Sequence, residues 1–405
     1  MGSFTETVSG LTGLYSAFWS DAGDILTFSL RRFSPRVKAE KEREVELLLE
    51  KGLPGMDRHE EMEEGERARY LGRAHTALGR LMMGEGDPSV DRFFSDCESA
   101  GKQFVTRSRE FDPALSEHDI HQALRNQWVF NSIQSYLSHP VTLTSSSLGY
   151  SLMYPYTDNR LDGSLRTIEE KDRFNESLKA CLTGEPELAA DGDAPGFRGL
   201  LRMIEQEYPR DRYPAGYESL LAIYSAQRNS LILHGTVDDM TEPYLRSLTV
   251  EKGGTSVAVD GYLVSGTLGP GELRSLFGYG VVLQFIDDLQ DIPEDTASGH
   301  STMFSRATLA GPLDAMTGRL MNFTCDTVRA LGRAPSGTRR SLAGLIEGSC
   351  LFLILEAVAR YSHLYSAGYV RGVEEFSPLR FSYLAGLHDR LKTALATREG
   401  ALFPA

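Results

Sequence analysis

The sequence predicts an all-α fold, and three observations lead to that prediction. Apolar residues recur at three- and four-residue intervals over long stretches such as Leu220–Leu231, which is typical of helices with one buried face. The alternation of apolar and polar residues that is typical of strands is scarce. Breaks rich in glycine and proline separate the periodic stretches, as expected of connections between helices. These breaks lie at Gly52–Gly55, Gly84–Pro88, Gly184–Gly196, Gly266–Gly271 and Pro335–Gly337.

The two most apolar regions predict neither a signal peptide nor a membrane span. The N-terminal stretch Met1–Arg32 has no basic leader, and Asp21 and Asp24 interrupt it. The run Cys350–Ala359 carries Glu356 and is shorter than the roughly 20 apolar residues that cross a bilayer. We therefore expect this run to be a buried core helix, with no transmembrane segment. Peripheral membrane contact and homodimerisation stay open.

Charge and cysteine content restrict the partners and the compartment. The formal charge is −14, from 42 Lys and Arg against 56 Asp and Glu. A broad nucleic-acid surface would have to overcome repulsion from the whole molecule, so we expect no nucleic-acid partner. An anionic substrate would need local cations or metal ions. The four cysteines are far apart in the sequence, which favours a reducing, cytoplasmic location.

The chain divides into a predicted N-terminal helical extension, residues 1–115, and a predicted catalytic domain, residues 116–405. The extension includes the segment Glu40–Arg80, where Glu and Arg are crowded as on a solvated helix face. Composition does not change sharply near residue 115, so one continuous domain is the alternative.

A first pair of carboxylates, Asp158 and Asp162, is spaced four residues apart. On a helix this spacing puts both on one face, about 6 Å apart. Two neighbouring anions repel each other, and a bridging divalent cation makes the pair favourable. Mg²⁺ takes one or two carboxylates and leaves its other positions to water and phosphate oxygens. The alternative is an exposed helix end in which Asp162 caps the helix beside Gly163.

A second cluster of carboxylates, Asp287, Asp288 and Asp291, ends the apolar helical stretch that starts at Gly278. Burying uncompensated charge costs several kcal/mol, so these acids predict a wet cavity lined by metal ions. Asp287 and Asp291 share a helix face. Asp295 extends the row, although Pro293 should end or kink the helix before it.

Both clusters can serve one site if the helices between them form an antiparallel bundle. About three Mg²⁺ ions would then draw charge off a diphosphate leaving group. The carbocation left behind needs an apolar, aromatic wall that excludes water. The aromatic candidates are Trp128, Phe130, Tyr154, Tyr156, Tyr224, Phe277, Tyr279 and Phe285.

The motifs resemble those of class I isoprenoid synthases. Gln284–Asp291 resembles the second aspartate-rich motif of isoprenyl diphosphate synthases, and its continuation to Asp295 and Gly299 resembles squalene and phytoene synthases. The segment Asp158–Ser164 is similar to the first motif of that group, most of all to that of bacterial large terpene synthases.

This resemblance implies an isoprenoid synthase type I helical bundle around a central cavity, three Mg²⁺ ions and a prenyl diphosphate substrate. Asp158 and Asp162 would hold one group of metal ions, and the acids of the second cluster with Asp295 the rest. Substrate contacts are assigned to five residues by position, two of them basic: Arg246, Lys252, Gln284, Tyr156 and Phe285. Lys252 is similar to a diphosphate-binding lysine and Arg246 to a diphosphate-sensing arginine.

The leading functional prediction is a terpene synthase, which ionises one prenyl diphosphate and cyclises or deprotonates the cation. A prenyltransferase of the squalene, phytoene or chain-elongating type is the alternative. Asn159 replaces the second consecutive acid of chain-elongating enzymes, and the middle motif of squalene and phytoene synthases has no clear match. A helical scaffold without chemistry is a further alternative, and a metal-dependent phosphohydrolase ranks below it.

Overall fold

The computed structural model describes residues 4–27, 30–52, 88–161, 168–185, 195–230, 240–332 and 337–387, and within these ranges it contains helices and no strand. The predicted all-α fold is confirmed. The helices in chain order are α1 (Phe4–Asp21), α2 (Pro35–Gly52), α4 (Pro88–Phe111), α5 (Glu117–Tyr136), α6 (Ser145–Leu161), α7 (Ile168–Thr183), α8 (Pro195–Glu207), α9 (Pro214–Ser230), α10 (Glu242–Ser265), α11 (Pro270–Gln290), α12 (Ile292–Ser298), α13 (Met303–Ala307), α14 (Asp314–Leu331), α15 (Gly337–Arg360), the 3₁₀ turn η4 (Ser362–Leu364) and α16 (Ala367–Glu374).

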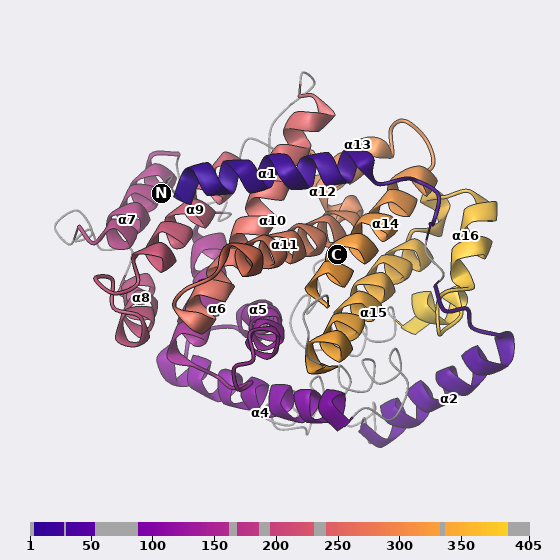
Figure 1. The fold of residues 1–405 in the computed structure, drawn as a ribbon, viewed down its shortest axis with the longest axis horizontal. Helices are drawn as coiled ribbons and strands as arrows, with labels where there is room; N and C mark the ends of the chain where they lie inside the picture. The colour runs from indigo at the N-terminus through magenta and orange to yellow at the C-terminus, as the bar shows by residue number, and fades with distance from the viewer. Residues whose placement is uncertain are drawn as a thin grey trace.

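The antiparallel helices α10 and α11 form the centre of the bundle (Figure 1). Two glycines let them cross closely. A Cβ atom at Gly253 would lie 2.6 Å from the carbonyl oxygen of Gly280, and a Cβ at Gly280 would lie 2.1 Å from the carbonyl oxygen of Gly253. Such separations are far below van der Waals contact, so larger side chains would force the helices apart. The close crossing brings Lys252 and Gln284 to neighbouring places on one wall.

Helices α5, α6 and α9 pack against α10, and α14 and α15 pack against α11. A capping box starts α5: the Ser116 hydroxyl accepts from the Asp119 amide at 3.1 Å, and the Asp119 carboxylate accepts from the Ser116 amide at 2.9 Å. Both exchanges satisfy helix-end donors and set where α5 begins. The register of α5 then decides which of its residues face α10 and α11.

Helix α1 lies across α10, α11 and α14 (Figure 1). Its Trp19 is fully buried, with ring centroids 4.6 Å from Phe285 and 5.7 Å from Phe323. The Tyr15 hydroxyl donates to the carbonyl oxygen of Arg274 at 2.7 Å. The described residues before position 115 thus share one apolar core with later helices. The domain boundary near residue 115 stays a prediction.

One described helix, Arg340–Arg360, is long and apolar enough to span a bilayer, and 56% of its most apolar window is buried inside the protein. Burial of this kind is typical of a core helix. The sequence predicted a buried core helix at the run Cys350–Ala359, which lies within it. The thiols of Cys181, Cys325 and Cys350 are buried and free, and Cys97 is free and half-buried.

Candidate functional site

A cavity of about 790 Å³ lies between helices α4, α5, α6, α7, α9, α10, α11 and α15. Its volume falls within the roughly 300–1,000 Å³ of small-molecule sites. The wall includes basic residues that are exposed to solvent, such as Arg125 and Arg228, and apolar residues that are buried, such as Ile223, Val257 and Ile286. The exposed basic residues lie where the cavity meets solvent.

The cavity wall carries more positive than negative charge, in contrast to the protein as a whole. Among the described residues, its basic side chains are Lys102, Arg125, Arg228 and Lys252, and its acidic side chains are Glu98 and Asp287. The balance on this wall is 4 − 2 = +2, against −14 for the chain. Ion pairs offset three of these cations, because Lys102 pairs with Glu98, Arg125 with Asp287 and Arg228 with Glu176, so the excess of positive charge is small.

A buried carboxyl group lies behind this wall. Asp260 on α10 is fully buried, its Oδ1 accepts from the Asn126 amide at 3.3 Å, and its Oδ2 has no partner. Desolvation by burial raises the pKa of Asp260 well above its usual range, against the opposing effect of the Asn126 hydrogen bond. Asn126 itself lines the cavity.

The second aspartate cluster lies at the end of α11, and its members face different surroundings. Asp287 lines the cavity, whereas Asp288 is buried with 6% of its surface exposed. Neighbouring residues on a helix point about 100° apart, so consecutive aspartates cannot share one face. The Tyr361 hydroxyl donates to the carbonyl oxygen of Gln290 at 2.7 Å, and this bond fixes the end of the helix.

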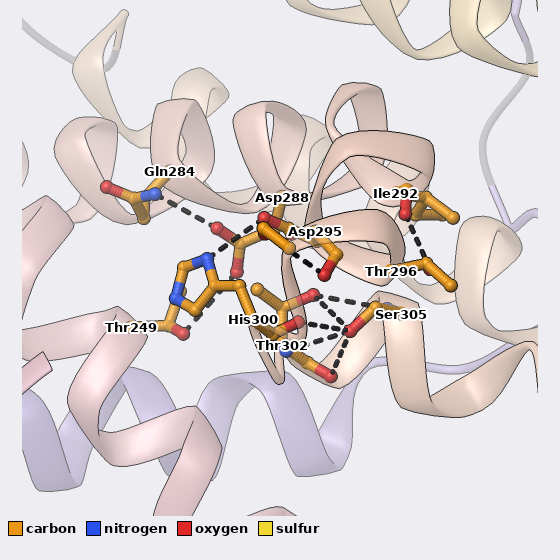
Figure 2. A network of polar contacts seen from close by, with 10 residues as sticks. Thr249, Gln284, Asp288, Ile292, Asp295, Thr296, His300, Thr302 and Ser305 are labelled. Atoms are coloured by element: carbon orange, nitrogen blue, oxygen red, sulfur yellow. Dashed lines mark hydrogen bonds and ion pairs between the residues drawn. The ribbon is translucent and has the colours of Figure 1, made fainter. Parts of the chain in front are cut away.

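The Asp288 carboxylate is held between α10 and α11 (Figure 2). It accepts from the Gln284 amide at 3.0 Å and from the Thr249 hydroxyl at 3.4 Å. Desolvation by burial raises the pKa of Asp288 to about 7, against the opposing effect of the Gln284 hydrogen bond. A share of the molecules therefore carries a proton on this group at neutral pH.

Asp291 and Asp295 continue the row beyond α11. Asp291 is exposed, yet desolvation and then the charge of Asp287 raise its pKa to about 7, while the Arg125 guanidinium acts to lower it. Asp295 is buried and lies 2.9 Å from Nδ1 of His300, which lines the cavity (Figure 2). Pro293, expected to end or kink the helix, lies in the first turn of a new short helix, α12.

The carboxylates at the end of α11 have the oxygen donor atoms and the negative charge that a hard divalent cation prefers. Asp287 and Asp291 are one turn apart, with the Asp291 amide donating to the Asp287 carbonyl oxygen at 2.9 Å. Glu294 has a buried carboxylate oxygen without a partner. Mg²⁺ prefers oxygen ligands and completes its shell with phosphate and water rather than with a cage of protein groups. Within the described ranges, no three acidic, His or Cys side chains come together in a group that could hold a metal ion.

The first aspartate cluster falls outside what the structure describes. Asp162 is not among the described residues, and for Asp158 the structure describes only its backbone, on α6. Tyr154 and Thr157, on the same helix, line the cavity. The convergence of the two clusters stays a prediction.

The five predicted substrate contacts divide into two groups. Lys252 and Gln284 line the cavity. The other three do not belong to the wall in this structure. Arg246 pairs with Glu242 at 2.9 Å, Tyr156 donates a hydrogen bond to Asp112, and Phe285 is buried against Trp19.

Aromatic side chains contribute much of the remaining wall. Of the aromatic candidates, Trp128, Tyr154, Tyr224 and Tyr279 line the cavity, and the wall also includes Phe93, Phe94 and Phe352. Sequence reasoning missed these last three, and it missed Arg125 and Arg228. A lone arginine or phenylalanine inside a helical stretch does not by itself predict a functional site. Its role depends on the neighbouring helices, which the sequence does not show.

Comparisons with protein-family models, with curated proteins and with solved structures give no match to this chain. The resemblance to class I isoprenoid synthases therefore rests on the sequence motifs alone.

Proposed function

We propose that the chain is a terpene synthase that ionises a prenyl diphosphate and converts the resulting carbocation to a hydrocarbon or alcohol. The observation that carries this proposal is a cavity whose wall combines exposed basic side chains with buried apolar groups and half-buried aromatic rings. A substrate with an anionic head and a long apolar tail matches that combination.

Residues at the open part of the cavity would receive the diphosphate. Lys252 and Arg228 lie on the wall and offer charge to phosphate oxygens. Asp287 and Asp291, with Asp158 and Asp162 as the sequence predicts, would hold Mg²⁺. When bound, Mg²⁺ ions neutralise charge that develops on the leaving group.

The deeper wall would protect and guide the carbocation. The side chains of Trp128, Tyr154, Tyr224 and Tyr279 line the cavity, and an aromatic face stabilises a cation by about 0.5–2 kcal/mol. Buried side chains such as Val257 and Ile286 keep water away from the cation. Cavity shape then decides which carbon atoms meet.

The test is a product analysis with single allylic diphosphates of increasing chain length in the presence of Mg²⁺. We expect a hydrocarbon or alcohol from at least one substrate, with one diphosphate released per product. Asp287→Asn and Asp158→Asn should lower turnover by at least about 100-fold, while Asp96→Asn on the exposed face of α4 should not. Release of no product from any single substrate would refute the proposal. Product that forms only from two substrates together would identify a prenyltransferase instead.

A further inference from the structure

An ion pair spans the open part of the cavity and joins two helices far apart in the sequence. Nη2 of Arg125 on α5 lies 3.1 Å from Oδ1 of Asp287 on α11. Both side chains line the cavity, with 67% of the Arg125 side chain and 43% of the Asp287 side chain exposed. Exposed pairs of this kind contribute only about 0–1 kcal/mol to the free energy of unfolding, so little free energy is lost when the pair breaks.

The place of this pair sets it apart from an ordinary surface pair. Among the described residues Arg125 is the one ion-pair partner of Asp287, the aspartate of the second cluster that lines the cavity. The charge of Arg125 also reaches Asp291, one helical turn further on. Arg125 thus neutralises part of the negative charge of Asp287 and Asp291, as a divalent cation bound to these carboxylates would.

We propose that Arg125 is a displaceable counter-ion, which holds Asp287 in the metal-free protein and binds the diphosphate once the carboxylate has turned to a divalent cation. This inference rests on the proposed function. The guanidinium group is a planar fork that matches phosphate oxygens with two parallel hydrogen bonds. Arg125 would join Arg228 and Lys252, so three helices, α5, α9 and α10, would each give one cation to the anionic head.

If Arg125 exchanges Asp287 for the diphosphate in this way, removing Arg125 should change the affinities for Mg²⁺ and for pyrophosphate in opposite directions. Free Mg²⁺ should bind more tightly, because Asp287 no longer has a competing partner. Pyrophosphate in the presence of Mg²⁺ should bind more weakly, because one charged donor is lost. A residue with a merely structural role would weaken both or change neither.

The experiment compares wild type, Arg125→Gln, Arg125→Lys and Arg92→Gln by titration calorimetry, first with Mg²⁺ alone and then with pyrophosphate at saturating Mg²⁺. Arg92 is the matched control, since it forms an exposed pair with Asp96 on α4 away from the cavity wall. For Arg125→Gln we expect a several-fold lower Kd for Mg²⁺ and a Kd for pyrophosphate about 10- to 100-fold higher. Arg125→Lys should recover part of the pyrophosphate affinity, and Arg92→Gln should match wild type.

The outcomes separate this inference from the proposed function. If wild type binds pyrophosphate with Mg²⁺ and Arg125→Gln shifts neither affinity, or shifts both in the same direction, the role of Arg125 is refuted and the proposed function stands. If wild type shows no Mg²⁺-dependent binding of pyrophosphate, the proposed function itself fails, and the role of Arg125 with it. Thermal melting in EDTA checks that each variant is folded.

Discussion

Replacing Asp288 by Asn should make the protein more stable, and by more at pH 8 than in mild acid. Asp288 is buried between α10 and α11, where it accepts hydrogen bonds from Gln284 and Thr249. An asparagine of the same shape keeps one acceptor oxygen, for the Gln284 amide, and its NH2 group can donate to the Thr249 hydroxyl. It removes the charge that the buried position disfavours.

The size of the effect follows from the pKa of the group. Burial raises the pKa of Asp288 from 3.8 to about 7, an interval of 7 − 3.8, or about 3 pH units. Between these values the folded protein keeps a proton that the unfolded chain has lost, so the free energy of unfolding falls as pH rises, and above about pH 7 the loss is complete. At about 1.4 kcal/mol per pH unit the full loss is at most roughly 4 kcal/mol, of which about 2–3 kcal/mol falls between pH 5 and pH 8.

The assay is urea unfolding of wild type and Asp288→Asn at a series of pH values from 5 to 8, in EDTA so that no divalent cation contributes. The difference between the two proteins isolates Asp288, because Asp291 and Asp260, whose pKa values are also raised, are present in both. We expect this difference to grow by about 2–3 kcal/mol in favour of Asp288→Asn over that range. Asp96→Asn, an exposed change on α4, controls for the loss of one formal charge.

A difference that stays constant with pH would show that the Asp288 carboxylate is ionised throughout, against the burial argument. A variant that is less stable at every pH would show that the hydrogen bonds from Gln284 and Thr249 outweigh desolvation.

Three further predictions concern packing and ligand binding. Gly253→Ala should lower the free energy of unfolding by about 1–3 kcal/mol, because its Cβ would meet the Gly280 carbonyl oxygen at 2.6 Å. As the control, Gly13→Ala on α1 should raise the free energy of unfolding by about 0.5–1 kcal/mol, because its Cβ would meet nothing within 4 Å. Trp19→Ala should cost about 3–5 kcal/mol, and Trp19→Phe much less, since the Trp19 Nε1 has no hydrogen-bond partner. Mg²⁺ with pyrophosphate should raise the Tm of wild type and not that of Asp287→Asn, as followed by differential scanning calorimetry.

Each of these has an outcome that would contradict it. Equal stability of Gly253→Ala and wild type would mean that α10 and α11 are not in close contact at this crossing. Equal losses for the two Trp19 variants would mean that the indole nitrogen has a partner. An equal rise in Tm for Asp287→Asn would place the ligand away from the end of α11.

Local sequence patterns determined the helical class and several of the helix ends. The predicted break Gly266–Gly271 lies where α10 ends, at Ser265, and α11 begins, at Pro270. The break Gly184–Gly196 separates α7, which ends at Thr183, from α8, which begins at Pro195. Periodicity, glycine and proline act through neighbouring residues, and for this reason they can be interpreted from the sequence alone.

Only the tertiary structure decided which side chains meet in the cavity. The sequence shows that Asp287 and Asp288 stand side by side, but the packing of α11 against α10 turns one to the cavity and buries the other. Likewise, Tyr154 lines the cavity while Tyr156, two residues on, contacts Asp112. Arg125 gave no signal in the sequence because its partner is 162 residues away. Helical periodicity predicts which residues share a face of a helix. Which other helix packs against that face depends on the packing of the whole bundle.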